Sequence, residues 1–300
     1  MRVILLFLDG VGIGKRNPQT NPFFAASIPT LTNLLGNTLP HLSNKRIRTN
    51  RAGLVPANAT LGVPGLPQSG TGQTAIFTGV NGARLFGRHY GPFPPTILRP
   101  IIESKNIFLQ LKARGRSVCF ANAFPQRFFD YTNAGTRRLT VTTLSCMMAG
   151  VPLLTAKELR RNEGVSPDFT RTRWPELGHP EIHPVTPRES GQHLWNIAEK
   201  HDFTVLEYWL TDHAGHSQKM KSGIDALEKF DQFLEGFLQE FRGRDSLMIV
   251  ISDHGNLEDL SVKTHTRNPV PCIAAGRYAH EFLSAIRNLT HITPAILKLF

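Results

Sequence analysis

Four short aliphatic runs constrain the fold of this chain more than any other feature of its sequence. They are Val3–Leu8, Ser117–Ala121, Thr204–Leu210 and Leu247–Ser252. Runs of this length, rich in β-branched and aliphatic residues, are typical of strands buried on both faces of a parallel sheet. Between the last two runs, apolar side chains recur at helical spacing from Ile224 to Phe241. This spacing predicts an amphipathic helix, and hence a strand–helix–strand unit.

Strands that alternate with helices predict an α/β fold, with a doubly wound, mostly parallel sheet and helices on both faces. In such a sheet, ligands bind in the crevice beyond the carboxyl ends of the strands. Three of the runs end at or within two residues of an aspartate, namely Asp9, Asp212 and Asp253. We therefore expect these carboxylates to meet at one edge of the sheet.

A single domain over residues 1–300 is expected, because no linker or change of composition divides the chain. Two segments, residues 82–100 and 153–190, are rich in Pro, Arg and Gly and lack sustained periodicity. They are long for connections within a compact domain, and such loops are usually functional or mobile. We expect them to lie as lid segments over the carboxyl ends of the strands.

Composition narrows the range of partners. The formal charge of +11 would concentrate anionic ligands near the protein. The basic residues form small scattered groups, so no specific nucleic-acid surface is predicted. The first apolar run is too short for a membrane span and has one basic residue before it, so we expect no membrane span and a cytoplasmic location. The three cysteines are far apart and indicate neither disulfides nor a thiolate zinc site.

Carboxylates and imidazoles occur together in three segments of the C-terminal third. Asp253 and His254 directly follow a predicted strand, and His265 lies in a proline-stiffened loop. Asp212 and His216 are four residues apart, which places both on one face if the chain turns helically after its strand. Taken singly, each segment has an ordinary alternative, such as a turn-capping aspartate or a surface histidine. Their joint occurrence favours a metal site.

Mixed carboxylate and imidazole ligands suit Zn²⁺ or Mn²⁺ better than Ca²⁺, which prefers shells made of oxygen alone. With Asp9, the three segments offer enough ligands for two divalent ions. Two ions held roughly 4 Å apart can stabilise both the attacking and the departing oxygen in a phosphoryl displacement. The pattern therefore predicts a catalytic site rather than a structural one.

Ser69 is the candidate nucleophile. It lies in a glycine-rich turn ahead of a helix predicted over Thr71–Thr78. Free backbone N–H groups and the positive end of the helix dipole could face a phosphate there. Thr71 and Gln73 are candidates for phosphate binding. The alternative is that Ser69 only caps the helix.

These segments together resemble the alkaline phosphatase superfamily. Five motifs occur in the order that this family uses: Val3–Gly12, Ser69 with Gly72 and Gln73, Asp212 with His216, Asp253–Asn256 and His265–Pro271. The last three look most like the branch of the cofactor-independent phosphoglycerate mutases and phosphopentomutases. The resemblance covers residues 1–80 and 204–300, and the middle third contains no motif that we can place.

The resemblance implies an alkaline phosphatase-like fold, two metal ions and a transiently phosphorylated Ser69. One ion would be surrounded by Asp9, Ser69, Asp253 and His254, and the other would be held by Asp212, His216 and His265. The sequence departs from the mutases at Gln73, where they usually carry histidine. It also lacks a counterpart of the arginine-rich substrate motifs of the phosphoglycerate enzymes.

The sequence thus predicts a two-metal hydrolase that acts on an anionic small-molecule phosphate ester through a phosphoserine. Two alternatives stay open. The first is a phosphomutase. The second is a basic protein that binds nucleic acid or membrane surfaces on the same scaffold without turnover. The identity of the ester, the choice between Zn²⁺ and Mn²⁺ and the oligomeric state stay open as well.

Overall fold

One seven-stranded sheet, in the order β2-β3-β7-β6-β1-β5-β4, organises the computed structural model, which describes residues 1–134 and 138–300. The strands are β1 (Arg2–Leu8), β2 (Ile47–Arg48), β3 (Ala52–Ala57), β4 (Val118–Phe120), β5 (Phe203–Tyr208), β6 (Ser246–Ile251) and β7 (Val270–Gly276). The central strands β6, β1, β5 and β4 are parallel, whereas β7, β3 and β2 pair antiparallel at one side. The prediction of an α/β fold with a mostly parallel sheet is confirmed, and the four predicted runs are its parallel strands.

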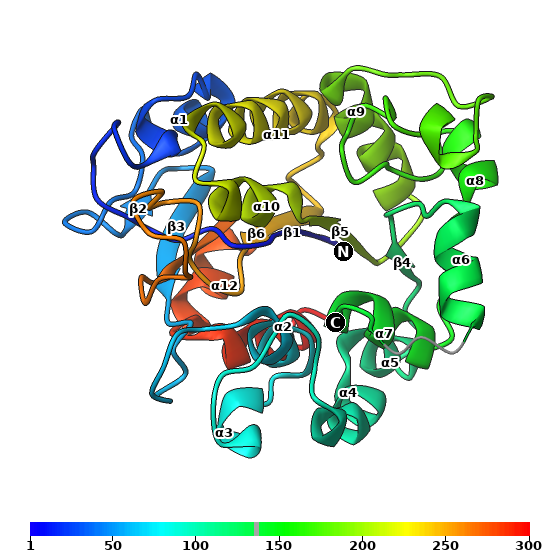
Figure 1. Cartoon of the computed structure of the whole chain (residues 1–300), viewed down its shortest axis with the longest axis horizontal. Coiled ribbons are helices and arrows are strands. Elements are labelled where there is room, and N and C mark those ends of the chain that lie inside the picture. The colour runs from blue at the N-terminus through cyan, green and yellow to red at the C-terminus, as the bar shows by residue number, and fades with distance from the viewer. Residues whose placement is uncertain (135–137) are drawn as a thin grey trace.

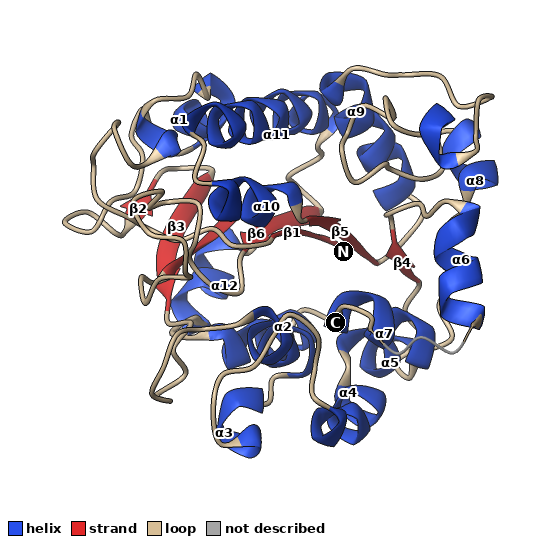
Figure 2. Ribbon diagram, in the orientation of Figure 1, coloured by secondary structure: helices blue, strands red, loops and turns tan. Residues whose placement is uncertain are grey.

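Helices cover both faces of this sheet (Figures 1 and 2). One layer contains α1 (Pro29–Leu34), α9 (Pro187–Ala198), α10 (Leu210–Ser217) and α11 (Met220–Glu240). The other contains α2 (Ser69–Thr78), α3 (Gly82–Phe86), α4 (Arg99–Lys105), α5 (Ile107–Lys112), α7 (Val141–Met148), α12 (Ala279–Ala285) and α13 (Ile292–Leu297). Beside β4 lie α6 (Gln126–Asn133) and α8 (Ala156–Arg160), and the short 3₁₀ helices are η1 (Pro22–Phe24), η2 (Thr96–Leu98), η3 (Pro175–Leu177) and η4 (Leu289–His291).

The alternation of side chains along β1 explains why both faces are covered. Leu5 and Phe7 belong to the core beneath the layer of α2, whereas Ile4 and Leu6 belong to the core beneath α11. Successive strand residues point to opposite faces, so a run that is apolar at every position needs a helix layer on each side. The amphipathic helix predicted from Ile224 to Phe241 is α11. Among the described residues, every helix is too short or too polar to cross a membrane.

Candidate metal centre

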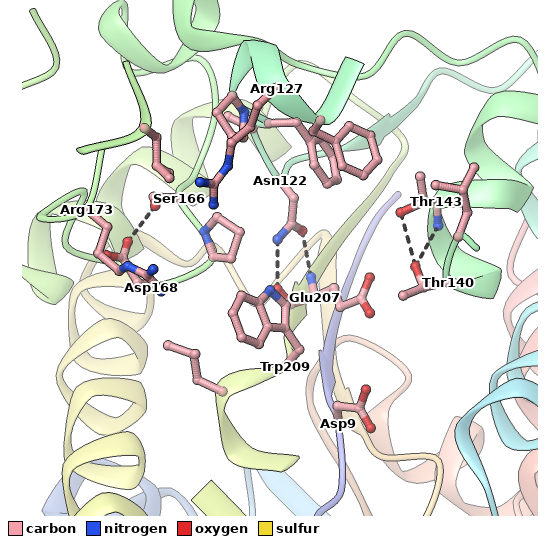
Figure 3. A pocket seen from close by; sticks show the side chains of 18 of the residues that line it. Asp9, Asn122, Arg127, Thr140, Thr143, Ser166, Asp168, Arg173, Glu207 and Trp209 are labelled. Carbon is pink, nitrogen blue, oxygen red and sulfur yellow. Dashed lines mark hydrogen bonds between the residues drawn. The ribbon is translucent and has the colours of Figure 1, made fainter. Parts of the chain in front are cut away.

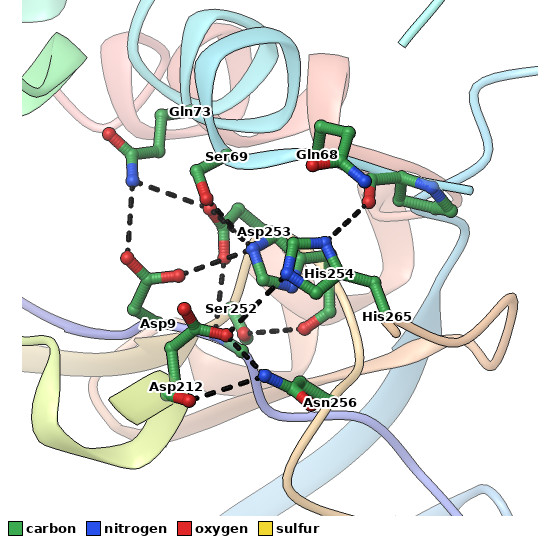
Figure 4. A network of polar contacts seen from close by, with 12 residues as sticks. Asp9, Gln68, Ser69, Gln73, Asp212, Ser252, Asp253, His254, Asn256 and His265 are labelled. Carbon is green, nitrogen blue, oxygen red and sulfur yellow. Dashed lines mark hydrogen bonds and ion pairs between the residues drawn. The ribbon is translucent and has the colours of Figure 1, made fainter. Parts of the chain in front are cut away.

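The centre of the sheet brings three carboxylates together. Asp9 directly follows β1, Asp253 follows β6, and Asp212 lies in α10, which begins after β5. Because β1 is hydrogen-bonded between β5 and β6, their carboxyl ends are neighbours. Figure 4 shows the three side chains facing a common space, with His254 and His265 between the sheet and α2. Asp9 and Asp253 are buried.

Asp212, His216 and His265 form the first set of donors. One ligand atom of each lies within 4.8 Å of the others. The Nε2 atom of His216 is 3.3 Å from Asp212 Oδ2, and the Nε2 atom of His265 is 3.7 Å from Asp212 Oδ1. The helical turn expected after the strand is α10, and it places Asp212 and His216 on one face. These three residues are the set that the family resemblance implied for one ion.

The second set is centred on His254. Its Nε2 atom lies 3.3 Å from Asp9 Oδ1, 3.6 Å from Asp253 Oδ2 and 2.9 Å from Ser69 Oγ. Asp212 also has a carboxylate oxygen within 4.8 Å of the ligand atoms of Asp9 and His254. Asp212 therefore lies between the two sets. Of the four residues expected around the other ion, Asp9, Ser69 and Asp253 surround the Nε2 atom of the fourth, His254.

The hydrogen bonds of the imidazoles orient their free nitrogens toward this space. The Nδ1 atom of His265 lies 2.8 Å from the carbonyl oxygen of Pro67, and that of His216 lies 3.3 Å from the carbonyl oxygen of Lys263. A carbonyl only accepts, so each Nδ1–H donates and each Nε2 keeps a lone pair. These two Nε2 atoms face each other at 3.2 Å. Two lone pairs repel at that distance unless a proton or a cation lies between them. A histidine that binds a metal through one nitrogen usually donates from its other nitrogen to a group such as a backbone carbonyl, as both histidines do here.

The electrostatics of the cluster also fit a divalent cation. Burial and the charge of Asp9 raise the pKa of Asp253 well above its usual value, and burial raises the pKa of Asp9. Burial alone would lower the pKa of His254, but the charges of Asp253 and Asp9 raise it to about 10. Burial and the charge of His254 lower the pKa of His265 to about 4. Among the described residues, Asp9 Oδ1 accepts no hydrogen bond. A cation would compensate this excess of buried negative charge.

The candidate nucleophile lies at the first residue of a helix. Helix α2 begins at Ser69, two residues before the predicted start. Gln68 occupies the N-cap position in an extended conformation and forms no side-chain capping hydrogen bond, so the sequence gives no signal for this start. Gly72 lets this helix approach β6 closely, since a Cβ atom there would lie 2.8 Å from the carbonyl oxygen of Asp253. The Ser69 hydroxyl consequently reaches the two sets of candidate ligands, which we call the metal-ligand cluster: Asp9, Asp212, His216, Asp253, His254 and His265.

Thr71 and Gln73 occupy different environments on the same helix. The Thr71 hydroxyl donates to the carbonyl of Gln68 at 3.1 Å and accepts from the Tyr90 amide at 3.3 Å. The structure therefore does not bring it into the cluster. The Gln73 amide lies 3.3 Å from Asp253 Oδ2 and 3.5 Å from Asp9 Oδ2, and its Oε1 atom accepts from the Val141 amide at 3.2 Å. Gln73 thus connects two carboxylates of the cluster with α7.

Two polar residues near the centre had no predicted role, although Asn256 belongs to the motif Asp253–Asn256. Asn256 donates to Asp212 Oδ1 at 2.7 Å and so fixes that carboxylate. Glu207 is buried near the end of β5, where burial and the charge of Asp253 raise its pKa to about 8. A single carboxylate inside an aliphatic run was the signal that could have identified Glu207.

A cavity of about 810 Å³ adjoins the cluster, and Asp9, Asp212 and Glu207 form part of its wall (Figure 3). Most of the remaining wall comes from residues 120–131, 138–143 and 166–177, in the middle third of the chain. Phe93, from the segment 82–100, also contributes. Both segments that we expected to lie over the site thus supply residues to this cavity.

Sequence comparisons find partial matches. A family model described as the metalloenzyme superfamily matches residues 184–300. The 2,3-bisphosphoglycerate-independent phosphoglycerate mutase of Cereibacter sphaeroides is 31% identical over 132 residues, which are 42% of this chain and 24% of the relative. Phosphoglycerate mutase 2 of the same type from Methanothermobacter thermautotrophicus is 31% identical over 90 residues, or 30% of this chain and 22% of the relative. The chain thus spans about a quarter of the length of these relatives.

Solved structures match over nearly the whole chain. The PH0037 protein from Pyrococcus horikoshii has a TM-score of 0.59 at 14% identity, covering 99% of this chain and 96% of that one. A cold-active alkaline phosphatase from the psychrophile Shewanella sp. has a TM-score of 0.55 at 14% identity, covering 100% and 99%. At this identity the likeness shows a shared fold, which is the alkaline phosphatase-like fold that the sequence predicted. Residues 184–300 are thus similar in sequence to the metalloenzyme superfamily, and the whole chain has the fold of the alkaline phosphatases.

Proposed function

We propose that this protein is a phosphate-ester hydrolase that forms a phosphoseryl intermediate at Ser69. One observation carries the proposal: Ser69 Oγ lies 2.9 Å from His254 Nε2, where the two sets of candidate ligands meet. A hydroxyl at a helix N-terminus, beside donors for two cations, suits the transfer of a phosphoryl group.

Each residue of the centre has a distinct role in this proposal. Asp9, Asp253 and His254 would hold one divalent ion near Ser69, and Asp212, His216 and His265 would hold the second. Zn²⁺ or Mn²⁺ bound there would favour ionisation of the Ser69 hydroxyl and offset negative charge on the phosphate. Gln73 and Asn256 would fix the positions of the carboxylates.

The reaction has two steps. Ser69 Oγ, after losing its proton to solvent, attacks phosphorus, the ester P–O bond breaks, and the alcohol leaves with a proton from solvent. Water then attacks the phosphoserine, which releases inorganic phosphate and restores the serine hydroxyl. Both steps are in-line displacements in which the attacking and departing oxygens need positive charge close by.

The test is phosphate release from a panel of esters. The protein is stripped with a chelator and then reloaded separately with Zn²⁺, Mn²⁺ or Mg²⁺. We expect release only after reloading, with a clear order among the cations. If no ester turns over, while DNA or anionic vesicles bind with a steep dependence on salt, the protein is instead a binding module on this scaffold.

A phosphomutase is the second candidate function, and the 31% identity to a phosphoglycerate mutase favours it. Against it, the nucleophile helix carries Gln73, and the match covers only 24% of that mutase. The two functions differ in their products. A mutase converts a phosphorylated substrate into its positional isomer with little free phosphate, whereas the proposed hydrolase releases one phosphate for every alcohol.

A further inference from the structure

We infer that the alcohol portion of the substrate is a bulky aromatic group that carries a further anionic group, and that the cavity beside Asp9 and Asp212 binds it. This inference rests on the proposed function and deepens it by naming the substrate class. The cavity is continuous with the cluster of candidate metal ligands. Asp9 and Asp212 belong both to the metal-ligand cluster and to the cavity wall. An ester whose phosphate lies at Ser69 would therefore extend its other half into the cavity.

The size of the cavity argues against a small alcohol. Its volume of about 810 Å³ lies within the range of sites that bind cofactors and drug-sized molecules, roughly 300–1,000 Å³. A phosphate with a one- or three-carbon alcohol would leave most of this space to water. Phosphate recognition alone needs only the cluster at the end of the sheet.

Among the described residues, seven Phe, Tyr and Trp side chains line the wall. Phe124 stacks on Phe128 with ring centroids 4.3 Å apart, and Phe120 packs against Phe124 at 5.8 Å. Trp209 and Tyr131 line the same cavity and stay 37% and 42% exposed. Large aromatic side chains left accessible inside a concave site, rather than packed into the core, are typical of surfaces that stack on flat ligands.

Three arginines supply the second recognition element. Arg127, Arg138 and Arg173 line the cavity, and in Figure 3 the guanidinium groups of Arg127 and Arg173 lie across it from Asp9. Within residues 1–134 and 138–300, the guanidinium groups of Arg127 and Arg173 form no hydrogen bond or ion pair. An unpaired guanidinium is a ready partner for a carboxylate, sulfonate or second phosphate.

The acidic residues of the wall offset only part of this charge. Asp168 also lines the cavity. Burial alone would raise its pKa, but hydrogen bonds from Ser166, Thr170 and the Arg171 amide lower it, so this carboxylate stays ionised in the same wall as the three arginines. Burial and the charge of Asp253 raise the pKa of Glu207 to about 8, so this carboxyl group is largely protonated near neutral pH. The far side of the cavity therefore offers positive charge to the distal end of a ligand.

The test compares esters whose leaving alcohols have similar acidity, so that chemical reactivity does not decide the result. We expect kcat/KM for 2-naphthylmethyl phosphate to exceed that for methyl phosphate by about 100-fold, and 4-carboxybenzyl phosphate to exceed benzyl phosphate by about tenfold. The matching phosphonates cannot be hydrolysed. In calorimetry on the metal-loaded protein, their affinities should follow the same order, with the lowest Kd for the aromatic and carboxylated compounds.

Variants identify the cavity as the cause. Phe128→Ala and Trp209→Ala should each lower the naphthylmethyl-to-methyl ratio about tenfold, whereas Ile97→Ala, which truncates an exposed apolar residue outside the cavity, should leave it unchanged. Arg127→Gln and Arg173→Gln should reduce the preference for the carboxybenzyl ester, with Arg244→Gln as the matched exposed control.

The outcomes separate this inference from the proposed function. Phosphate release with equal kcat/KM for large and small esters would overturn the inference and leave the hydrolase intact. Absence of turnover for every ester would overturn the hydrolase, but the aromatic phosphonates would still have to bind more tightly than methylphosphonate for the inference to stand. Equal Kd values for the phosphonates would refute it in either case.

Discussion

The metal-ligand cluster and the aromatic cavity share Asp9 and Asp212, yet they are built on opposite principles. The cluster takes buried charges from the ends of β1 and β6 and a half-buried carboxylate from α10, and backbone carbonyls fix its imidazoles. The cavity takes apolar rings from α6 and from loops beside β4, and its charges include three exposed arginines. Under the proposed function, bond breaking takes place in the first region and the second region selects the substrate.

Ligand removal should produce the largest effect and should not discriminate between substrates. Asp253→Asn and His265→Ala should each deplete metal from their own set and lower kcat/KM for every ester by more than about 10⁴-fold, because three or four ligands leave little redundancy. Metal content by mass spectrometry and turnover are measured together, with the exposed His183→Ala as control. Wild-type metal content in either ligand variant would refute the assignment of that residue.

Loss of the nucleophile should come next, because it leaves the metal centre in place. Ser69→Ala should keep its fold and most of its metal while losing about 10³-fold in turnover. Thr71→Ala should lose less, since the Thr71 hydroxyl contacts Gln68 and Tyr90 rather than the cluster. Trapping with substrate at low pH, followed by peptide mass spectrometry, locates the phosphate. Phosphate on Thr71 would overturn the choice of Ser69.

A smaller effect is expected from the residue that supports the carboxylates. Gln73→Ala removes an amide that lies near both Asp253 and Asp9, and metal affinity should fall by about 10–100-fold, as is typical when a ligand loses its outer contact. Gln110→Ala, on the exposed side of α5, is the control. Unchanged metal affinity would show that the Gln73 contacts are incidental. Selectivity among esters should not change, because Gln73 is not part of the cavity wall.

The smallest effect concerns Glu207 and appears in stability rather than catalysis. Its raised pKa stabilises the folded state below the ordinary value of 4.5, and this contribution is lost as pH rises through about 8, because only the folded state keeps the proton in that window. Glu207→Gln should remove this loss, with a difference of at most a few kcal/mol. Urea unfolding in chelator from pH 4 to pH 9 measures it, with Glu103→Gln as the exposed control. Parallel curves for wild type and Glu207→Gln would contradict the shift.

The two regions also differ in how far the sequence could predict them. The parallel strands and the candidate metal ligands could be predicted from the sequence. Each ligand either follows a predicted strand or lies in a short motif, and carboxylates and imidazoles are residue types that bind metal ions. The start of α2 was placed two residues late because Gln68 gives no capping signal. Strands β2 and β3 were not predicted, since the first has two residues and the second contains glycine and proline.

The cavity could not be predicted because its wall has no spacing in the sequence. Its residues extend from Phe93 to His213, apart from Asp9, and they come from loops, a short helix and strand ends that only the folded chain brings together. The type of an aromatic residue does not tell whether its side chain lies in the core or faces a ligand. Most of the cavity wall lies in the middle third of the chain, where no motif marked it in the sequence.

The central position of β1 would also determine when the proposed metal centre can form. In the sheet, Val3 pairs with Phe203 on one side and with Leu247 on the other. During synthesis, β1 leaves the ribosome long before either partner strand exists, and contacts so distant in sequence make folding slow. If Asp9, His254 and His265 are the ligands, a cation could bind them only after synthesis has passed His265. Metal supply would then govern how much mature protein accumulates, rather than how its first elements form.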